Sequence, residues 1–75
     1  MVDQTLDAKG LNCPLPILRA KKALQTIPVG GTLEVLATDP GSVKDFQAFC
    51  NTTGTELVES GQQGTTYRFV LRRKH

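Results

Sequence analysis

The sequence predicts an α+β fold, a two-layer α/β sandwich in which two helices cover one face of a four-stranded mixed sheet. Apolar residues recur at helical spacing in two segments, and four other segments have the alternation or composition of strands. Their order along the chain is βαβαββ, and helices on one face of the sheet would bury both apolar stripes together. We expect residues 1–75 to form a single domain with a folded core at about residues 4–73.

The first half of the chain predicts a strand, a helix and a second strand. Residues 4–8 form a strand candidate, and a helix is expected from Pro14 to about Ile27, where Pro28 and two glycines end it. Residues 32–38 alternate like a strand. A right-handed crossover through the helix would make these two strands parallel. The helix presents one apolar stripe to the core: Ile17, Ala20, Leu24 and Ile27.

The second half predicts a helix and a hairpin. The helix has two possible starts: Asp39 as N-cap with Pro40 in the first position, or Ser42 as N-cap with Asp45 three residues later. Gly54 fits the position just past its end. Strands over residues 55–60 and 65–73 would pair antiparallel across a turn at residues 61–64. Four residues of the second helix share its apolar face: Val43, Phe46, Phe49 and Cys50.

Composition limits the function. The 75 residues include two cysteines. The formal net charge of +2 does not by itself indicate nucleic-acid binding, and the absence of tryptophan argues against a surface on which single-stranded nucleic acid would stack. No secretory or transmembrane segment is evident, so we expect a cytoplasmic protein with reduced thiols and no membrane partner. We expect no cofactor or metal, since only Cys13, Cys50 and His75 offer soft ligands. We also expect a monomer, since no long apolar stripe is left over.

Cys13 is the candidate reactive residue because it directly precedes the first helix. Pro14 suits the first helical position and Pro16 is tolerated in the first turn, since neither position needs an intrahelical N–H donor. Free N–H groups and the helix dipole lower the pKa of such a cysteine from about 8.5 to between about 3.5 and 7.5. Each proline removes one donor, so we expect a moderate lowering. The alternative is that Cys13 is a small buried apolar residue.

The surroundings of Cys13 leave two further alternatives open. Leu15 and Leu18 either complete the core or form a small apolar docking spot beside the thiol. Asp39 ends the second strand, and the carboxyl ends of parallel neighbours meet at one edge of a sheet. Asp39 therefore either lies near Cys13, caps the second helix, or does both. No second cysteine stands in Cys-x-x-Cys spacing, so the thiolate suits carrying a group better than forming a disulfide.

Three segments resemble the TusA family of small sulfur carriers, also called SirA-like. They are residues 6–16 (LDAKGLNCPLP), residues 37–42 (ATDPGS) and residues 67–72 (YRFVLR). The Cys-Pro-x-Pro motif after a Leu-Asp-x-x-Gly strand is specific to that family, and the resemblance covers nearly all of residues 5–73. It implies a βαβαββ sandwich, in agreement with the pattern above.

The resemblance also implies a chemistry. Cys13 would accept sulfane sulfur as a persulfide from a cysteine desulfurase or rhodanese-like donor, then relay it to a cysteine of an acceptor protein. The pathways implied are tRNA thiolation, molybdenum-cofactor assembly and sulfur oxidation. Asp39 matches a functional family position, and Lys21 and Lys22 fall where the family often has basic residues, which could steer an acidic partner or tRNA. Leu15 replaces the acidic residue of the tRNA-thiolation members, which weakens assignment to that pathway.

Two other functions remain open, and in both Cys13 would be structural. The open sheet face with Arg68, Arg72, Arg73 and Lys74 could form an RNA-binding module. Alternatively, the apolar patch beside Cys13 could serve a regulatory protein interaction. A solvated helix face is the simpler interpretation of Lys21 and Lys22.

Overall fold

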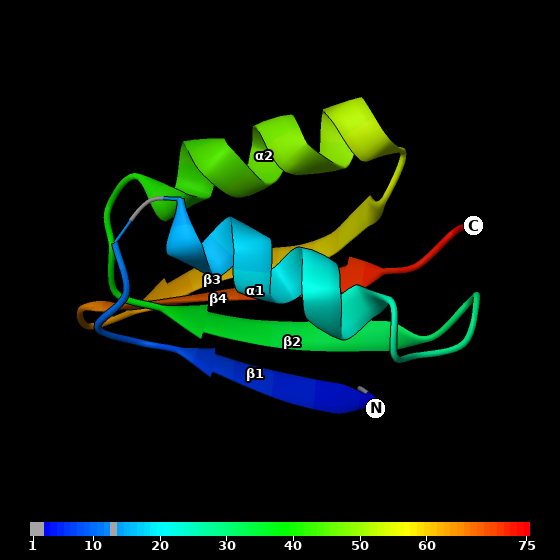
Figure 1. Cartoon of the computed structure of the whole chain (residues 1–75). Coiled ribbons are helices and arrows are strands. Elements are labelled where there is room, and N and C mark those ends of the chain that lie inside the picture. Colours follow the sequence, from blue (N-terminus) through cyan, green and yellow to red (C-terminus); the bar gives the residue numbers. More distant parts are fainter. Residues whose placement is uncertain (1–2, 13) are drawn as a thin grey trace.

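The computed structural model describes residues 3–12 and 14–75 and confirms the predicted order of elements. The strands and helices alternate as βαβαββ, with these bounds: β1 Gln4–Ala8, α1 Leu15–Leu24, β2 Thr32–Ala37, α2 Ser42–Thr53, β3 Glu56–Gln63 and β4 Thr66–Arg72. Both helices lie on one side of the sheet (Figure 1). The two-layer α+β prediction is therefore correct.

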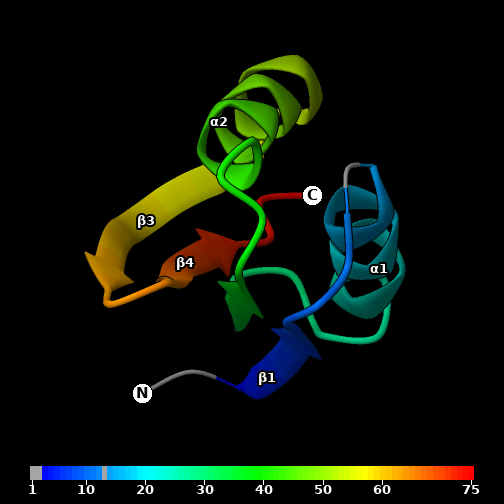
Figure 2. The same ribbon diagram turned by 90° about the vertical axis from the view of Figure 1, so that its left-hand side faces the viewer.

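The sheet is mixed, and its strand order is β1-β2-β4-β3. β1 and β2 pair in parallel, because α1 returns the chain to the starting edge of the sheet between them. β4 pairs antiparallel with both β2 and β3, so β2 and β4 are central and β1 and β3 are the edges. The view along the strands shows α1 above the β1–β2 side and α2 above the β3–β4 side (Figure 2).

The core lies between the helices and the sheet. Phe46 of α2 is fully buried and stacks on Phe69 of β4 with ring centroids 4.6 Å apart. Phe49 meets Phe46 edge to face at 6.5 Å, from a half-buried position. The predicted alternation of β2 is confirmed, since its inward side chains are all fully buried: Leu33, Val35 and Ala37. Of the predicted α1 stripe, Ala20, Leu24 and Ile27 are buried and Ile17 is half-buried.

The first helix is shorter than the sequence predicted. Pro14 is its N-cap, with φ −98° and ψ 17°, and Leu15 is the first helical residue. The helix ends at Leu24, three residues before the predicted end. Pro28 explains this difference, because a proline disfavours helical conformation in the preceding residue. Ile27 still reaches the core from the turn that follows α1.

The second helix uses neither of the two predicted N-caps. Gly41 is the N-cap and Ser42 is already helical and buried. Asp39 shapes the preceding turn instead: its Oδ1 accepts the Gly41 N–H at 3.2 Å, and its carbonyl oxygen accepts the Ser42 hydroxyl at 2.6 Å. At the other end, Gly54 takes the predicted left-handed conformation, with φ +77°.

The predicted turn at residues 61–64 is wrong in position. β3 continues to Gln63, which pairs with Thr66, so the hairpin turn contains only residues 64 and 65. Gly64 has φ +62°, as expected for the first residue of a two-residue hairpin turn. Gly61 pairs with Arg68 inside the hairpin. The glycine-rich composition therefore marked the right region but not the residues that turn.

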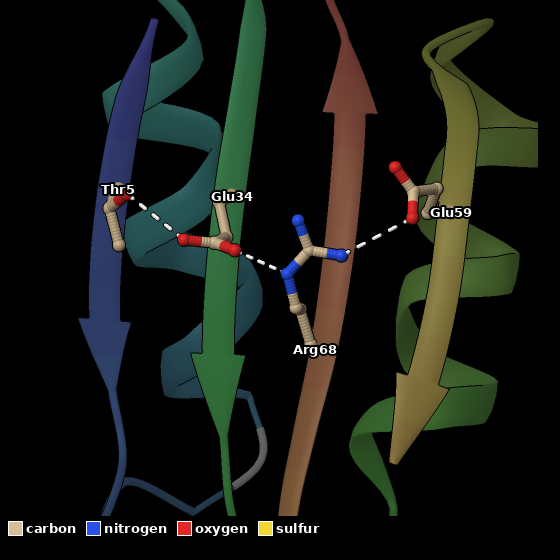
Figure 3. A network of polar contacts seen from close by, with 4 residues as sticks. All are labelled: Thr5, Glu34, Glu59 and Arg68. Atoms are coloured by element: carbon tan, nitrogen blue, oxygen red, sulfur yellow. Dashed lines mark hydrogen bonds and ion pairs between the residues drawn. The ribbon is translucent and has the colours of Figure 1, made fainter. Parts of the chain in front are cut away.

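The open face of the sheet carries an ion-pair network. Arg68 donates to Glu34 on β2 through Nε and to Glu59 on β3 through Nη1, the latter at 3.4 Å. Thr5 on β1 donates its hydroxyl to Glu34 at 3.1 Å (Figure 3). These four side chains join all four strands across the face. Beside them Val70 is only 3% exposed, although it points away from the helices.

This network predicts a pH-dependent stability. The hydrogen bond from Arg68 lowers the pKa of Glu34 below its ordinary value of 4.5, with a further contribution from Thr5. Ionised Glu34 therefore contributes stability above pH 4.5, and this contribution is lost as the pH falls through the lowered pKa. We expect Glu34→Gln to reduce the free energy of unfolding at about pH 7 and much less at about pH 3.

Urea unfolding of both proteins at the two pH values measures this difference. Glu59→Gln is the matched control, since its side chain is 63% exposed and its distance to Arg68 is the longer one. A Glu34→Gln effect of equal size at both pH values would contradict an ionic contribution.

Candidate functional site

The loop between β1 and α1 begins with a tight turn. Leu11 donates its N–H to the Ala8 carbonyl at 3.2 Å, and Gly10 has φ +83°, the conformation that a type II turn requires at its third residue. The Gly10 N–H donates to Thr38 Oγ1 at 3.0 Å. This bond ties the β1–α1 loop to the start of the β2–α2 loop, at the carboxyl ends of the two parallel strands.

The loop ends at the exposed start of α1. Leu15 donates its N–H to the Asn12 carbonyl at 2.8 Å, and Leu18 donates to the Pro14 carbonyl at 3.1 Å. Asn12 and Pro14 are both exposed. Cys13, the predicted sulfur acceptor, stands between them in the chain but lies outside the described residues.

Two prolines reduce the number of N–H donors at this helix start. Pro14 and Pro16 have none, and the N–H of Leu15 is bound to Asn12. No acidic residue lies in the first turn, so the positive end of the helix dipole is not neutralised by a neighbouring carboxylate. Pro16 is fully buried and anchors the turn against the core. The moderate stabilisation of negative charge expected for Cys13 stays a prediction.

Leu15 and Leu18 do not complete the core. Leu15 is 45% exposed and Leu18 is 55% exposed, while Pro16 takes the inward position of the first turn. Large apolar side chains at this exposure, two and five residues after a candidate reactive residue in the chain, favour the docking alternative. Two exposed leucines on one helical turn thus form a small apolar surface next to Cys13 in the chain.

Asp39 occupies the loop that Thr38 joins to Gly10. It is half-buried, and its hydrogen bonds to Gly41 and Ser42 give it a structural role before α2. The predicted meeting of the two loops at one sheet edge is therefore correct. The predicted proximity of Asp39 to Cys13 involves a residue outside the described part of the chain and stays a prediction.

The second cysteine has a different environment. Cys50 is buried in the core on α2, as predicted, and this burial raises the pKa of its thiol. A raised pKa leaves less thiolate, which is the nucleophilic form. Of the two cysteines, Cys50 is therefore suited to packing.

The two predicted lysines lie near the end of α1. Lys21 and Lys22 are exposed and stand in its last turn, where positive charge is favourable beside the helix carboxyl end. Lys21 borders a cavity of about 300 Å³ with Arg73 and His75. Lys22 borders a separate groove beside β1.

Sequence reasoning missed the contribution of α2 to the surface beside Pro14. A cleft of about 350 Å³ lies between the two helices, with Pro14 and Ile17 on one side. Ala48, Phe49 and Thr52 form the α2 side. Their helical spacing could have indicated a second, outward-facing stripe next to the buried one.

The basic residues proposed for RNA binding are largely engaged. Arg68 pairs with two glutamates, and Arg72 pairs with Glu56 at 3.4 Å. Arg73 donates to the Ile27 carbonyl at 2.6 Å and secures the chain after α1. The open face therefore offers phosphate groups little uncompensated positive charge.

Two further features concern only the part of the chain that the structure describes. Within residues 3–12 and 14–75, no cluster of three His, Cys, Asp or Glu side chains is placed to hold a metal ion. Neither helix in these ranges has the length and apolar character needed to cross a membrane.

Comparison with known proteins identifies the family. The family model described as Sulfurtransferase TusA matches residues 4–73. The sulfur carrier protein TusA of Allochromatium vinosum is 59% identical over 95% of this chain and 93% of its own length. A putative sulfur carrier protein of Neisseria meningitidis is 50% identical over 99% of this chain and 100% of its own length.

A solved structure agrees with these sequences. The SirA-like protein of Desulfitobacterium hafniense superimposes with a TM-score of 0.81 at 28% identity, covering 96% of this chain and 99% of the other. The resemblance seen in the Cys-Pro-x-Pro motif is confirmed, and relatives named as sulfur carriers support a sulfur-carrier role. The chain belongs to the TusA family of sulfurtransferases.

Proposed function

We propose that the protein carries sulfane sulfur as a persulfide on Cys13 and relays it to a cysteine of an acceptor protein. The observation that supports this most is the contrast between the two cysteines. Cys50 is buried, whereas Cys13 is flanked in the chain by exposed Asn12 and Pro14 at the start of a helix. A relay thiol needs access and a stabilised thiolate, and a position between exposed residues at a helix start favours both.

The transfer is an exchange between thiols without net oxidation. The Cys13 thiolate attacks the outer sulfur of the donor persulfide, forms a new S–S bond and releases the donor cysteine as a thiolate. In the second step, an acceptor thiolate attacks the outer sulfur now on Cys13, and Cys13 leaves as a thiolate. The donor is a cysteine desulfurase or a rhodanese-like protein. The acceptor belongs to tRNA thiolation, molybdenum-cofactor assembly or sulfur oxidation, and Leu15 in place of an acidic residue favours the last two.

Loading followed by mapping tests the proposal. The reduced protein is incubated with a cysteine desulfurase and cysteine, or with thiosulfate and a rhodanese. Intact mass spectrometry should show a gain of one sulfur atom that reductant removes. Digestion without reductant should then place this sulfur on the peptide that contains Cys13. Sulfur found on the Cys50 peptide, or no loading from either donor, would exclude the persulfide-carrier proposal.

The exposed leucines predict a separate effect on protein-to-protein transfer. Leu18→Glu places a charge on the proposed docking surface, and we expect loading from a protein donor to slow by about tenfold or more, equivalent to roughly 1.4 kcal/mol in binding. Loading from a small polysulfide should stay at the wild-type rate, because a small donor needs no docking surface. Stopped-flow or quenched mass measurements of both reactions give the two rates.

Val29→Glu is the matched control for this experiment. Val29 is 61% exposed, yet it lies in the loop after α1, remote from the helix start. It should leave both rates unchanged. Equal slowing of the two donors by Leu18→Glu would show that the substitution disturbs Cys13 itself and not the docking of a protein.

A further inference from the structure

β1 is an open edge of the sheet. It pairs with β2 on one side, and within residues 3–12 and 14–75 no strand pairs with it on the other (Figure 2). Edge strands present unpaired backbone donors and acceptors to any extended chain that approaches. β1 contains no proline, no lysine and no bulge, three features that prevent such pairing, and Asp7 is its one charged residue.

The register identifies the backbone groups that face outward. Arg73 donates its N–H to the Gly31 carbonyl at 3.0 Å, and Leu33 pairs with Leu71 in the same antiparallel ladder, so Leu33 and every second residue of β2 face β4. Glu34 therefore faces β1. Because Glu34 is the parallel partner of Thr5, it bonds to the residues on either side of Thr5, and these residues face β2. The backbone groups of Thr5 and Asp7 therefore face the open edge, and their N–H groups are oriented toward an incoming strand.

The opposite edge is less regular than β1. β3 has a register shift between Leu57 and Glu59, and such a bulge interrupts the regular spacing that a new strand needs. From residue 58 onward its side chains are all exposed, and most are polar. The two edges of one sheet are therefore not equivalent, and β1 is the one suited to strand addition.

A groove of about 700 Å³ runs between β1 and α1 along this open edge. Gln4 and Leu6 form its strand side. Leu15 and Leu18, at the start of α1, form its apolar end. Toward the other end the α1 side chains become basic: Arg19 and Lys22. Thr26 closes that end by donating its hydroxyl to Gln4 Oε1 at 3.1 Å.

We propose that an extended segment of a partner protein, with an apolar and an acidic side chain two residues apart, adds to β1 as a fifth strand. The apolar side chain packs on Leu15 and Leu18, and the acidic side chain pairs with Lys22 or Arg19. The spacing agrees, since alternate strand residues are about 6.6 Å apart and residues four apart on a helix about 6 Å. Main-chain bonds to Thr5 and Asp7 supply affinity and the groove supplies specificity. Assigning the segment to a sulfur donor or acceptor rests on the proposed function.

The binding experiment needs no sulfur chemistry. The probe is a threonine-rich ten-residue peptide with a Leu-x-Glu core, the order that an antiparallel partner would present along this groove. It is titrated into isotope-labelled Cys13→Ser protein and followed by amide NMR. We expect saturable shifts along β1 and α1, and slowed hydrogen exchange at the amides of Thr5 and Asp7. The same peptide with Lys in place of Glu should bind about tenfold or more weakly.

Two pairs of variants locate the contact. Thr5→Pro removes an outward N–H while its fixed φ suits an edge strand, and should weaken binding about tenfold, whereas Thr5→Ala, which loses the same hydroxyl and keeps the N–H, should not. Lys22→Glu leaves the strand intact and should also weaken binding about tenfold, whereas Lys44→Glu on the exposed side of α2 should not.

Three results would overturn the proposal: shifts confined to β3 or the open sheet face, equal affinity for the Glu and Lys peptides, or no saturable binding of either. Because the readout is independent of sulfur, its failure is distinct from a failure of the persulfide function. Peptide binding without loading of wild-type Cys13 would keep the edge site and reject the carrier mechanism. Loading of wild-type Cys13 without peptide binding would keep the carrier mechanism and reject the edge site.

Discussion

Serine in place of Cys13 is expected to abolish sulfur loading from every donor. A serine hydroxyl stays protonated at neutral pH here, because no histidine or other base stands beside it in sequence, and it cannot form the S–S bond of a persulfide. The gain of one sulfur atom in intact mass should fall to background. Transfer to an acceptor protein should be lost with it, since the other thiol, that of Cys50, is buried.

Cys50→Ala is the matched control for this result. It removes the buried thiol and leaves only a small cavity, so the fold should survive with reduced stability. Loading should then proceed at the wild-type rate and to one sulfur per chain. Residual loading of Cys13→Ser that disappears in the double variant would instead make Cys50 the acceptor. That outcome requires the core to open, because Cys50 lies on the buried side of α2 in the folded protein.

The sequence predicted those parts of the fold that periodicity determines. Strand alternation in residues 32–37 and helical spacing in residues 42–53 each produced a buried face where it was expected. Boundaries depended on single bonds that a pattern does not specify. The start of α2 was ambiguous because Asp39 and Ser42 bond to each other, and the resulting turn makes Gly41 the N-cap.

Burial on the open face could not be read from alternation. Val70 points away from the helices, so its pattern predicts exposure, yet it is almost fully buried. Its cross-strand neighbours are Glu34 and Glu59, both of which bond to Arg68. The long side chains of this network flank Val70, and such coverage depends on strand order as well as on the sequence of β4.

The sequence predicted the position of the candidate site in the chain but not which side chains around it are exposed. The Cys-Pro-x-Pro segment located Cys13 and the family, and the parallel pairing of β1 with β2 placed its loop beside Thr38 as expected. Whether Leu15 and Leu18 are buried depends on which side of the first turn faces the sheet. Pro16 takes the inward position, and this choice exposes both leucines. The groove along β1 also required the strand order, since only an edge strand can form it.

Phe46→Ala is expected to leave the chain largely unfolded at room temperature. Phe46 is fully buried, stacks on Phe69 and meets Phe49 edge to face, so truncation removes both ring contacts and opens a cavity. Replacing a buried phenylalanine by alanine costs about 3–5 kcal/mol. A core of this size rarely supplies more than about 3–5 kcal/mol of net stability. The loss is thus comparable to the whole free energy of unfolding, and far-UV circular dichroism during urea titration measures it.

The same helix provides the control that separates this effect from a general loss of aromatic area. Phe49→Ala removes the same ring from a half-buried position, so less apolar surface returns to water and a smaller cavity remains. It should retain a cooperative transition at a lower urea midpoint. A Phe46→Ala midpoint equal to that of Phe49→Ala would mean that the stacked pair between α2 and β4 is not the centre of the core. The two-layer arrangement, in which Gly10 of the β1–α1 loop is bonded to Thr38, would then depend chiefly on the packing of α1.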